Sequence, residues 1–178
     1  MKTLLEELNI EQNTPLNFVQ VSHIIRGRVP GLVMKFVEVA NLKKPYKLEQ
    51  FLPHKCNAAL CLLTATVSGR EQNHWSALIR HEDNTLEWFD SMAFGFNHLG
   101  VLLDDPDFID FLRKHKARKN TKRLQKEARD VKTCSLHCIV RLAKRKLTNP
   151  QYERWIKSMR MDTDRLVTLL TYIGHLTL

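Results

Sequence analysis

The sequence predicts an α+β domain in which a central mixed or antiparallel sheet packs against helices. Short β-rich apolar segments occupy residues 32–89, and apolar residues recur at helical spacing from residue 104 onward. Strands followed by helices are typical of the α+β class. The 178-residue chain shows no internal repeat, low-complexity tract or Gly/Ser linker. We therefore expect one domain over residues 1–178.

The expected elements follow in chain order. Residues 3–11 place Leu4, Leu5 and Leu8 at helical spacing behind Thr3, which suits a capped amphipathic helix. Strands are expected at 32–39, 58–67, 75–79 and 85–89, and the polar residues 80–84 suit a hairpin loop. A helix is expected after residue 104, with Asp107 as its N-cap. Residues 134–142 are too apolar for a surface helix, so we expect a buried one, followed by helices at 151–159 and 162–173.

Composition excludes several classes of protein. With 43% hydrophobic and 26% charged residues, the chain has the composition of an ordinary globular domain. No apolar run approaches the ~20 residues that a membrane span requires. The acidic residues Glu6 and Glu7 near the start argue against a secretory signal. The four cysteines, Cys56, Cys61, Cys134 and Cys138, are therefore expected to be reduced thiols in an intracellular compartment.

The net charge of +9 is unevenly distributed. Residues 1–112 carry 10 Lys and Arg against 14 Asp and Glu, whereas residues 113–160 carry 17 against 3. Such a basic segment indicates a polyanion partner, although many charge runs form only a solvated surface. No aromatic residue lies in the basic run from Lys114 to Lys132, so contact with the DNA backbone without base reading is expected. The candidate nucleic-acid-binding residues are Lys114, Lys116, Arg118, Lys119, Lys122 and Arg123.

Three residues could form a nucleophilic site. His74 opens one predicted strand and Asp90 closes the next, so a hairpin would bring an imidazole and a carboxylate together at one end of the sheet. Cys134 begins the buried helix, where the helix dipole lowers the pKa of a thiol. The basic residues Arg129 and Lys132 precede it and would act in the same direction. The pattern predicts a Cys134 nucleophile, a His74 base and an Asp90 that orients the base.

These residues carry a resemblance to a known family. The pairs and runs His74-Trp75, Phe89-Asp90-Ser91 and Cys134-Ser135-Leu136-His137-Cys138 stand in the order of the clan that includes adenain and the ubiquitin-like-protein proteases. Residues 24–142 most resemble the adenain family of viral cysteine proteases. Three shorter segments are similar to loops of that family: Arg28-Val29-Pro30-Gly31-Leu32-Val33, Gly69-Arg70-Glu71 and Phe94-Gly95-Phe96.

The resemblance implies a papain-like cysteine endopeptidase, without a metal, that matures capsid or core precursor polypeptides. It implies action in the virion and in the host nucleus or another intracellular replication site. Gln125 becomes the candidate for the side-chain amide of the oxyanion hole. DNA is an implied cofactor, and so is an activating peptide. That peptide would bind non-covalently, because no cysteine lies between Cys61 and Cys134 to receive it.

Other readings stay open at this point. A ubiquitin-like-protein deconjugating protease shares the His, Asp, Cys order. A basic nucleic-acid-binding core protein on an inactive protease fold would explain the charge alone. Cys134 could also be a buried structural cysteine, and the four cysteines could in principle bind zinc, although their spacing is poor for it.

Overall fold

The computed structural model describes residues 3–29, 31–67, 69–128 and 131–172. Its strands form one mixed sheet in which each strand lies beside its neighbour in the sequence. β1 and β2 pair in parallel, β2, β3 and β4 form an antiparallel meander, and β5 pairs in parallel with β4. The strands are β1 Met34–Glu38, β2 Ala58–Val67, β3 Arg70–Arg80, β4 Leu86–Phe89 and β5 Arg118–Lys119. The expected α+β class with a mixed sheet is confirmed.

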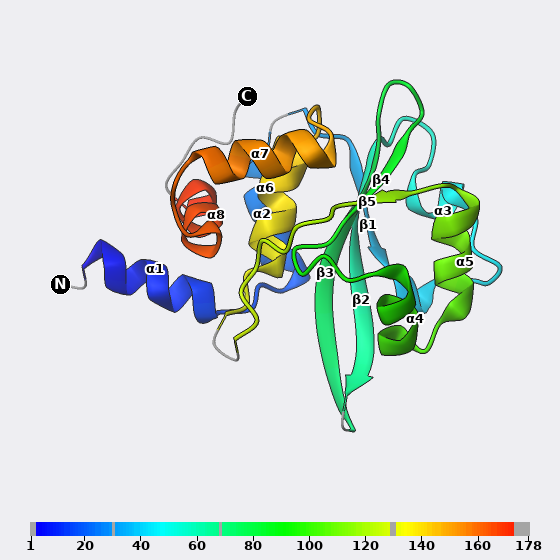
Figure 1. Cartoon of the computed structure of the whole chain (residues 1–178), viewed down its shortest axis with the longest axis horizontal. Helices are drawn as coiled ribbons and strands as arrows, with labels where there is room; N and C mark the ends of the chain where they lie inside the picture. The colour runs from blue at the N-terminus through cyan, green and yellow to red at the C-terminus, as the bar shows by residue number, and fades with distance from the viewer. Residues whose placement is uncertain (1–2, 30, 68, 129–130, 173–178) are drawn as a thin grey trace.

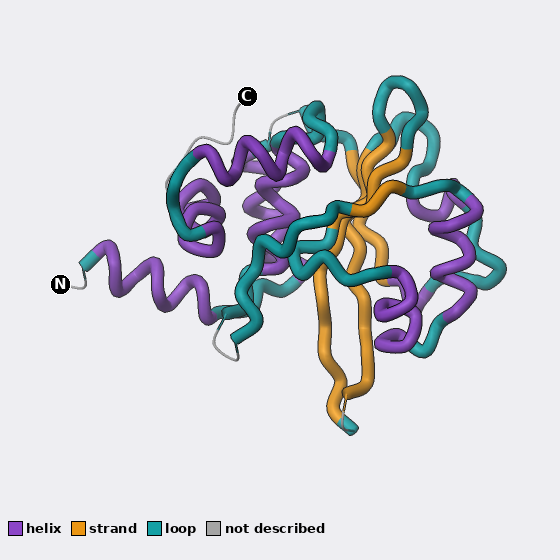
Figure 2. Tube along the Cα trace, in the orientation of Figure 1, coloured by secondary structure: helices purple, strands orange, loops and turns teal. Residues whose placement is uncertain are grey.

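Helices cover both faces of this sheet (Figures 1 and 2). One face packs against α2, α6, α7 and α8, and the other against α3, α4 and α5. A short 3₁₀ helix, η1, covers Val39–Asn41. The helices are α1 Leu4–Asn13, α2 Phe18–Arg28, α3 Leu48–Phe51, α4 Phe96–Leu103, α5 Pro106–Lys114, α6 Cys134–Ala143, α7 Asn149–Ser158 and α8 Thr163–Tyr172. None of the helices among the described residues has both the length and the apolar character of a membrane span.

The two faces bury separate apolar clusters because side chains alternate along each strand. On β3, Ala77 and Ile79 face α6 and its neighbours, whereas Leu78 faces α4 and α5. The α6 side contains Leu136, Ile139 and other fully buried residues of that helix. The predicted burial is therefore confirmed for residues 135–142, whereas Cys134 at the helix start is partly exposed, and the helix is held by apolar contacts on the sheet.

The β3–β4 hairpin has the arrangement expected from the sequence. Ala77 pairs with Phe89 and Arg80 with Leu86, so the end of β4 lies beside the middle of β3. Asp90 follows the last residue of β4 that pairs with β3, and His74 precedes the part of β3 that pairs with β4. β3 begins five residues earlier than predicted, because Arg70–His74 pair with the end of β2. The polar side chains of these residues lack the apolar pattern of a strand, so the sequence did not predict the extension. Together with the end of β2 it forms a two-stranded ribbon that projects from the sheet (Figure 1).

Several local expectations need correction. The N-cap of α5 is Asp105 and not Asp107, since the Asp105 carboxylate accepts a hydrogen bond from Phe108 N at 3.3 Å and Pro106 occupies the first helical position. The helix α2 was not expected, although Asn17 and Gln20 form a reciprocal capping box at its start. Ile173, the predicted end of the last helix, lies outside the described residues.

A buried ion pair fastens α6 to β4. The Arg141 guanidinium, which is fully buried, donates to Glu87 Oε2 at 2.9 Å, and its Nε donates to Asn149 Oδ1 at 3.1 Å. His81 Nε2 also lies 3.0 Å from Glu87 Oε2. Arg141 was counted in the basic segment of the sequence, but it belongs to the core and adds nothing to the surface charge. The pair aligns the helix that begins at Cys134 with the strand that ends beside Asp90.

Candidate active site

The imidazole of His74 and the carboxylate of Asp90 meet at the end of the sheet. His74 Nε2 lies 2.8 Å from Asp90 Oδ1, and the carboxylate is 1% exposed. Asp90 Oδ1 also accepts a hydrogen bond from Met92 N at 2.9 Å. The expectation that the hairpin brings these two side chains together is confirmed. Because Nε2 faces Asp90, Nδ1 is the ring nitrogen left to face a nucleophile.

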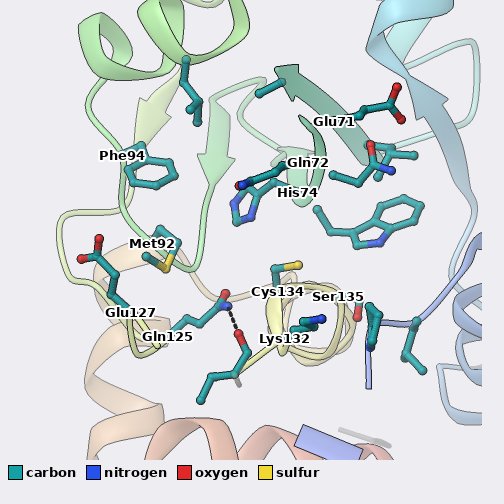
Figure 3. Close-up of a pocket in the computed structure, with 18 of the residues that line it drawn as sticks. Glu71, Gln72, His74, Met92, Phe94, Gln125, Glu127, Lys132, Cys134 and Ser135 are labelled. Atoms are coloured by element: carbon teal, nitrogen blue, oxygen red, sulfur yellow. Dashed lines mark hydrogen bonds between the residues drawn. The ribbon is translucent and has the colours of Figure 1, made fainter. Parts of the chain in front are cut away.

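Cys134 is the first residue of α6 and lies beside His74 (Figure 3). Its thiol is partly exposed, and it also receives hydrogen bonds from the backbone N–H groups of Trp75 and Ser135. The Ser135 N–H lies in the first turn of α6, where backbone N–H groups have no acceptor within the helix and are free to bind the sulfur. Three polar groups therefore surround the sulfur, namely one imidazole and two amides. All of them favour the thiolate.

The charges of His74 and Cys134 support each other. Burial alone would lower the pKa of His74, but the negative charge of Asp90 and the interaction with Cys134 raise it to about 10. Burial likewise opposes ionisation of Cys134, yet His74 and the two amides bring the pKa of the thiol below its ordinary value. Both shifts act in the direction of a thiolate paired with an imidazolium. This is the resting state of an activated cysteine nucleophile.

The site opens into a pocket of about 1080 Å³. Met92 and Phe94 form one wall, and the ring of Phe94 lies 6.0 Å from that of His74. Residues 15–18, ahead of and within the first turn of α2, form another, and the projecting β2–β3 ribbon lines the mouth with Glu71 and Gln72. Figure 3 shows Cys134 and His74 between these walls.

Gln125 lines the same pocket as Cys134, although it stands nine positions earlier in the sequence. Its Oε1 accepts a hydrogen bond from Ser91 Oγ at 2.7 Å, and its Nε2 donates to Val131 O at 3.4 Å. The second contact is long, so the amide retains donor capacity toward the pocket.

The remaining candidates lie elsewhere. None of Lys114, Lys116, Arg118, Lys119, Lys122 and Arg123 lines the pocket; they belong to the end of α5, to β5 and to the segment after it. Lys132 does line the pocket, whereas Arg129 lies outside the described residues. Cys138 is fully buried one turn below Cys134, where its thiol donates to Trp75 O at 3.4 Å and burial raises its pKa well above the ordinary value.

Cys61 is also fully buried, and burial raises the pKa of its thiol. Cys56 is partly exposed. Among the residues that the structure describes, no group of three or more His, Cys, Asp and Glu side chains is placed to hold a metal ion.

Sequence reasoning missed two polar residues that support the site. Asn120 and Ser91 are both buried, and both contact the main chain or side chain of a candidate residue. Asn120 sits between basic residues in a segment interpreted by its charge alone. Its signal was a short polar side chain directly after a two-residue strand, which no periodic pattern could distinguish from a surface loop.

The paired charges predict an unusual pH dependence for alkylation. Labelling of Cys134 by iodoacetamide should slow less between pH 8.5 and pH 6.5 than labelling of an ordinary thiol, because His74 and two backbone amides hold the pKa of this thiol below its ordinary value. An ordinary thiol, with a pKa near 8.5, would lose about fiftyfold in rate over the same interval. Mass spectrometry of labelled peptides measures both rates, with the partly exposed Cys56 as an internal reference. A tenfold fall per pH unit at Cys134 would contradict the ion pair.

The fold and the site together define an α+β protein with a buried carboxylate, an imidazole and a thiolate at the mouth of one pocket. Compared with known proteins, the chain is similar to the uncharacterized protein V9 of Sputnik virophage, with 25% identity over 118 residues. The alignment covers 57% of this chain and 67% of that protein. This similarity favours an origin in a virus or virus-like element. No protein-family model matches the sequence, and no solved structure matches it.

Proposed function

We propose that this protein is a cysteine endopeptidase with a papain-like arrangement of the adenain type. One observation carries the proposal: a histidine bonded to a buried carboxylate through Nε2 lies beside a helix-terminal cysteine whose thiol has a lowered pKa. Structural cysteines are buried and have a raised pKa, as Cys138 and Cys61 do, whereas Cys134 is partly exposed and has a lowered pKa. The contrast within one molecule favours a nucleophile.

The proposed reaction uses both charges. The Cys134 thiolate attacks the carbonyl carbon of the scissile peptide bond, and the carbonyl oxygen becomes an oxyanion. The imidazolium of His74 donates the Nδ1 proton to the leaving amine as the carbon–nitrogen bond breaks. His74 then removes a proton from water, the hydroxide attacks the thioester, and the thiol is released. Asp90 keeps the ring oriented and stabilises its positive charge throughout.

The oxyanion needs preorganised donors close to the sulfur. The backbone N–H groups at the start of α6 point out of the helix end, and Gln125 extends its amide from the opposite side of the pocket (Figure 3). Ser91 fixes the amide by donating to Gln125 Oε1, which turns the NH₂ group away from Ser91 and toward the pocket and Val131. We assign Gln125 as the side-chain donor of the oxyanion hole.

We infer that the substrates are capsid or core precursor polypeptides, which agrees with the similarity to a virophage protein. The test is incubation of the purified protein with candidate precursors of the element that encodes it, with and without DNA. New termini, identified by mass spectrometry, are the expected result. Cleavage of a ubiquitin-like modifier fused to a reporter, with the precursors left intact, would instead favour a deconjugating protease.

The surface cations support a second property, binding of a polyanion. Lys114, Lys116 and Lys122 are exposed, and the structure shows no ion pair to them among the described residues. Arg123, in contrast, pairs with Glu127 at 2.6 Å. Unpaired cations on a short stretch of chain gain free energy by releasing counterions from phosphate. We therefore propose that DNA binds along β5 and its flanking segments and holds the enzyme and its substrates on the same DNA molecule.

Replacing Lys116 and Lys122 with Gln should weaken binding to a short DNA duplex and make it less dependent on salt. Each lost phosphate contact reduces the slope of log affinity against log salt by about 0.9. Fluorescence anisotropy at several salt concentrations measures the slope. The matched control replaces the exposed Lys43 and Lys55, far along the sequence from β5, and should leave the slope unchanged. Equal slopes for both double variants would remove this surface from consideration.

A further inference from the structure

We infer that Asn120 is a positioning residue of the site, and that its side-chain amide holds the Asp90 carboxylate in line with His74. The inference rests on the proposed function. Asn120 follows β5 directly and is 1% exposed. It touches neither His74 nor Cys134 in any hydrogen bond, so its effect would pass through Asp90.

The Asn120 amide clamps both backbone groups of Asp90. Asn120 Oδ1 accepts a hydrogen bond from Asp90 N at 2.8 Å, and Asn120 Nδ2 donates to Asp90 O at 2.8 Å. The second Nδ2 hydrogen reaches Lys122 O at 3.1 Å, and the Asn120 backbone N–H reaches Trp88 O at 3.2 Å. Only a side-chain amide offers a donor and an acceptor side by side at this length, so no other residue type reproduces the clamp.

The position of Asp90 explains why a clamp is needed. The ladder between β4 and β5 ends at the pair Trp88 and Lys119, so Asp90, two residues further along, has no strand partner on the β5 side. Its carboxylate still has to meet an imidazole at 2.8 Å. The Asn120 amide replaces the missing partner. A backbone left unpaired at this point would let the carboxylate shift relative to the ring.

Asn149 provides a matched comparison within the molecule. It is also 1% exposed and also joins β4 to β5, because its Nδ2 donates to Trp88 O at 3.1 Å and to Arg118 O at 3.3 Å. Its Oδ1 accepts from Arg141. Asn149 thus has the same side-chain amide and the same burial as Asn120. It bonds to Trp88 and Arg118, further from the site, and its side chain forms no hydrogen bond with Asp90. Loss of either amide should reduce stability, but only Asn120 should alter the thiol.

The experiment measures the pH dependence of Cys134 alkylation by iodoacetamide in Asn120→Ala and Asn149→Ala. A displaced Asp90 stabilises the imidazolium less, and the Cys134 thiolate then loses its counter-charge. We expect Asn120→Ala to move the lower limb of the profile upward by about one pH unit, so that at any pH on that limb alkylation becomes about tenfold slower. Asn149→Ala should lower the melting temperature and leave the profile in place.

Asn120→Asp keeps the side-chain shape and the acceptor oxygen but removes the two N–H donors of Nδ2. It replaces the alanine variant in the experiment if that variant does not fold. It should shift the profile in the same direction. Folded Asn120 variants with the wild-type profile would overturn the inference. The proposed function has a separate control, since wild-type Cys134 must react faster than Cys134 in His74→Ala. If that difference is absent, the proposed function fails; if it is present and the Asn120 variants match wild type, only the role of Asn120 fails.

Discussion

Cys134→Ala is expected to abolish cleavage of precursor polypeptides, with a loss of turnover on the order of 10⁴- to 10⁶-fold. The reason is that no second group in the pocket can attack the carbonyl. Ser135 is buried in the first turn of α6, and Cys138 lies beneath the pocket as a buried thiol with a raised pKa. The measurement is the rate of appearance of new termini under identical enzyme and substrate concentrations.

The fold should survive this change, because Cys134 is only partly buried and makes its contacts at the rim of the core. Circular dichroism and the melting temperature check that point. The matched control is Cys56→Ala, which removes the other partly exposed thiol and should keep full activity. Equal processing by wild type and Cys134→Ala would falsify the mechanism and leave polyanion binding as the better-supported property.

His74→Ala is expected to cause the second-largest loss, on the order of 10⁴-fold in turnover. Two effects combine here. Without the imidazolium, burial dominates and returns the Cys134 thiol to its protonated form near neutral pH. The leaving amine also loses its proton donor. Alkylation of Cys134 at pH 6.5 measures the loss of the thiolate alone, and a peptide-cleavage assay measures both effects together; both rates should fall in the same variant.

Asp90→Asn should retain more activity than His74→Ala, with a loss of about 10²-fold, because an amide oxygen can still accept from His74 Nε2 without carrying a charge. His54→Ala changes an exposed histidine outside the pocket and should behave as wild type. The order wild type, Asp90→Asn, His74→Ala in decreasing activity is the expected result. An Asp90→Asn variant less active than His74→Ala would mean that the carboxylate acts directly on the substrate.

The expected pH profile of cleavage follows from the same two groups. Activity should fall at low pH as the Cys134 thiolate is protonated, and at high pH as His74 loses its proton with a pKa of about 10. The imidazolium is required as the acid for the leaving amine, so the upper limit belongs to His74. The lower limit lies below the ordinary pKa of a thiol because Cys134 is stabilised as an anion.

Local patterns were sufficient where one element carried its own signal. The strand β2 was predicted with the bounds that the structure has, because an unbroken β-rich apolar run separates clearly from its polar flanks. The burial of α6 followed from apolar residues all around the helix. Several short or polar elements were not predicted from the sequence, because their hydrophobic periodicity is weak and their stability comes from tertiary packing. They include α2, α4, β5 and the first half of β3.

The sequence by itself determined the order of elements and the three residue types of the site, together with the hairpin that joins His74 to Asp90. Only the tertiary structure decided that Cys134 reaches this pair, that Gln125 enters the same pocket and that Asn120 clamps Asp90. The physical reason is that hydrophobic periodicity reports which face of an element is buried. The partner of a single buried polar group depends instead on directional hydrogen bonds between distant segments, which leave no repeating pattern along the chain.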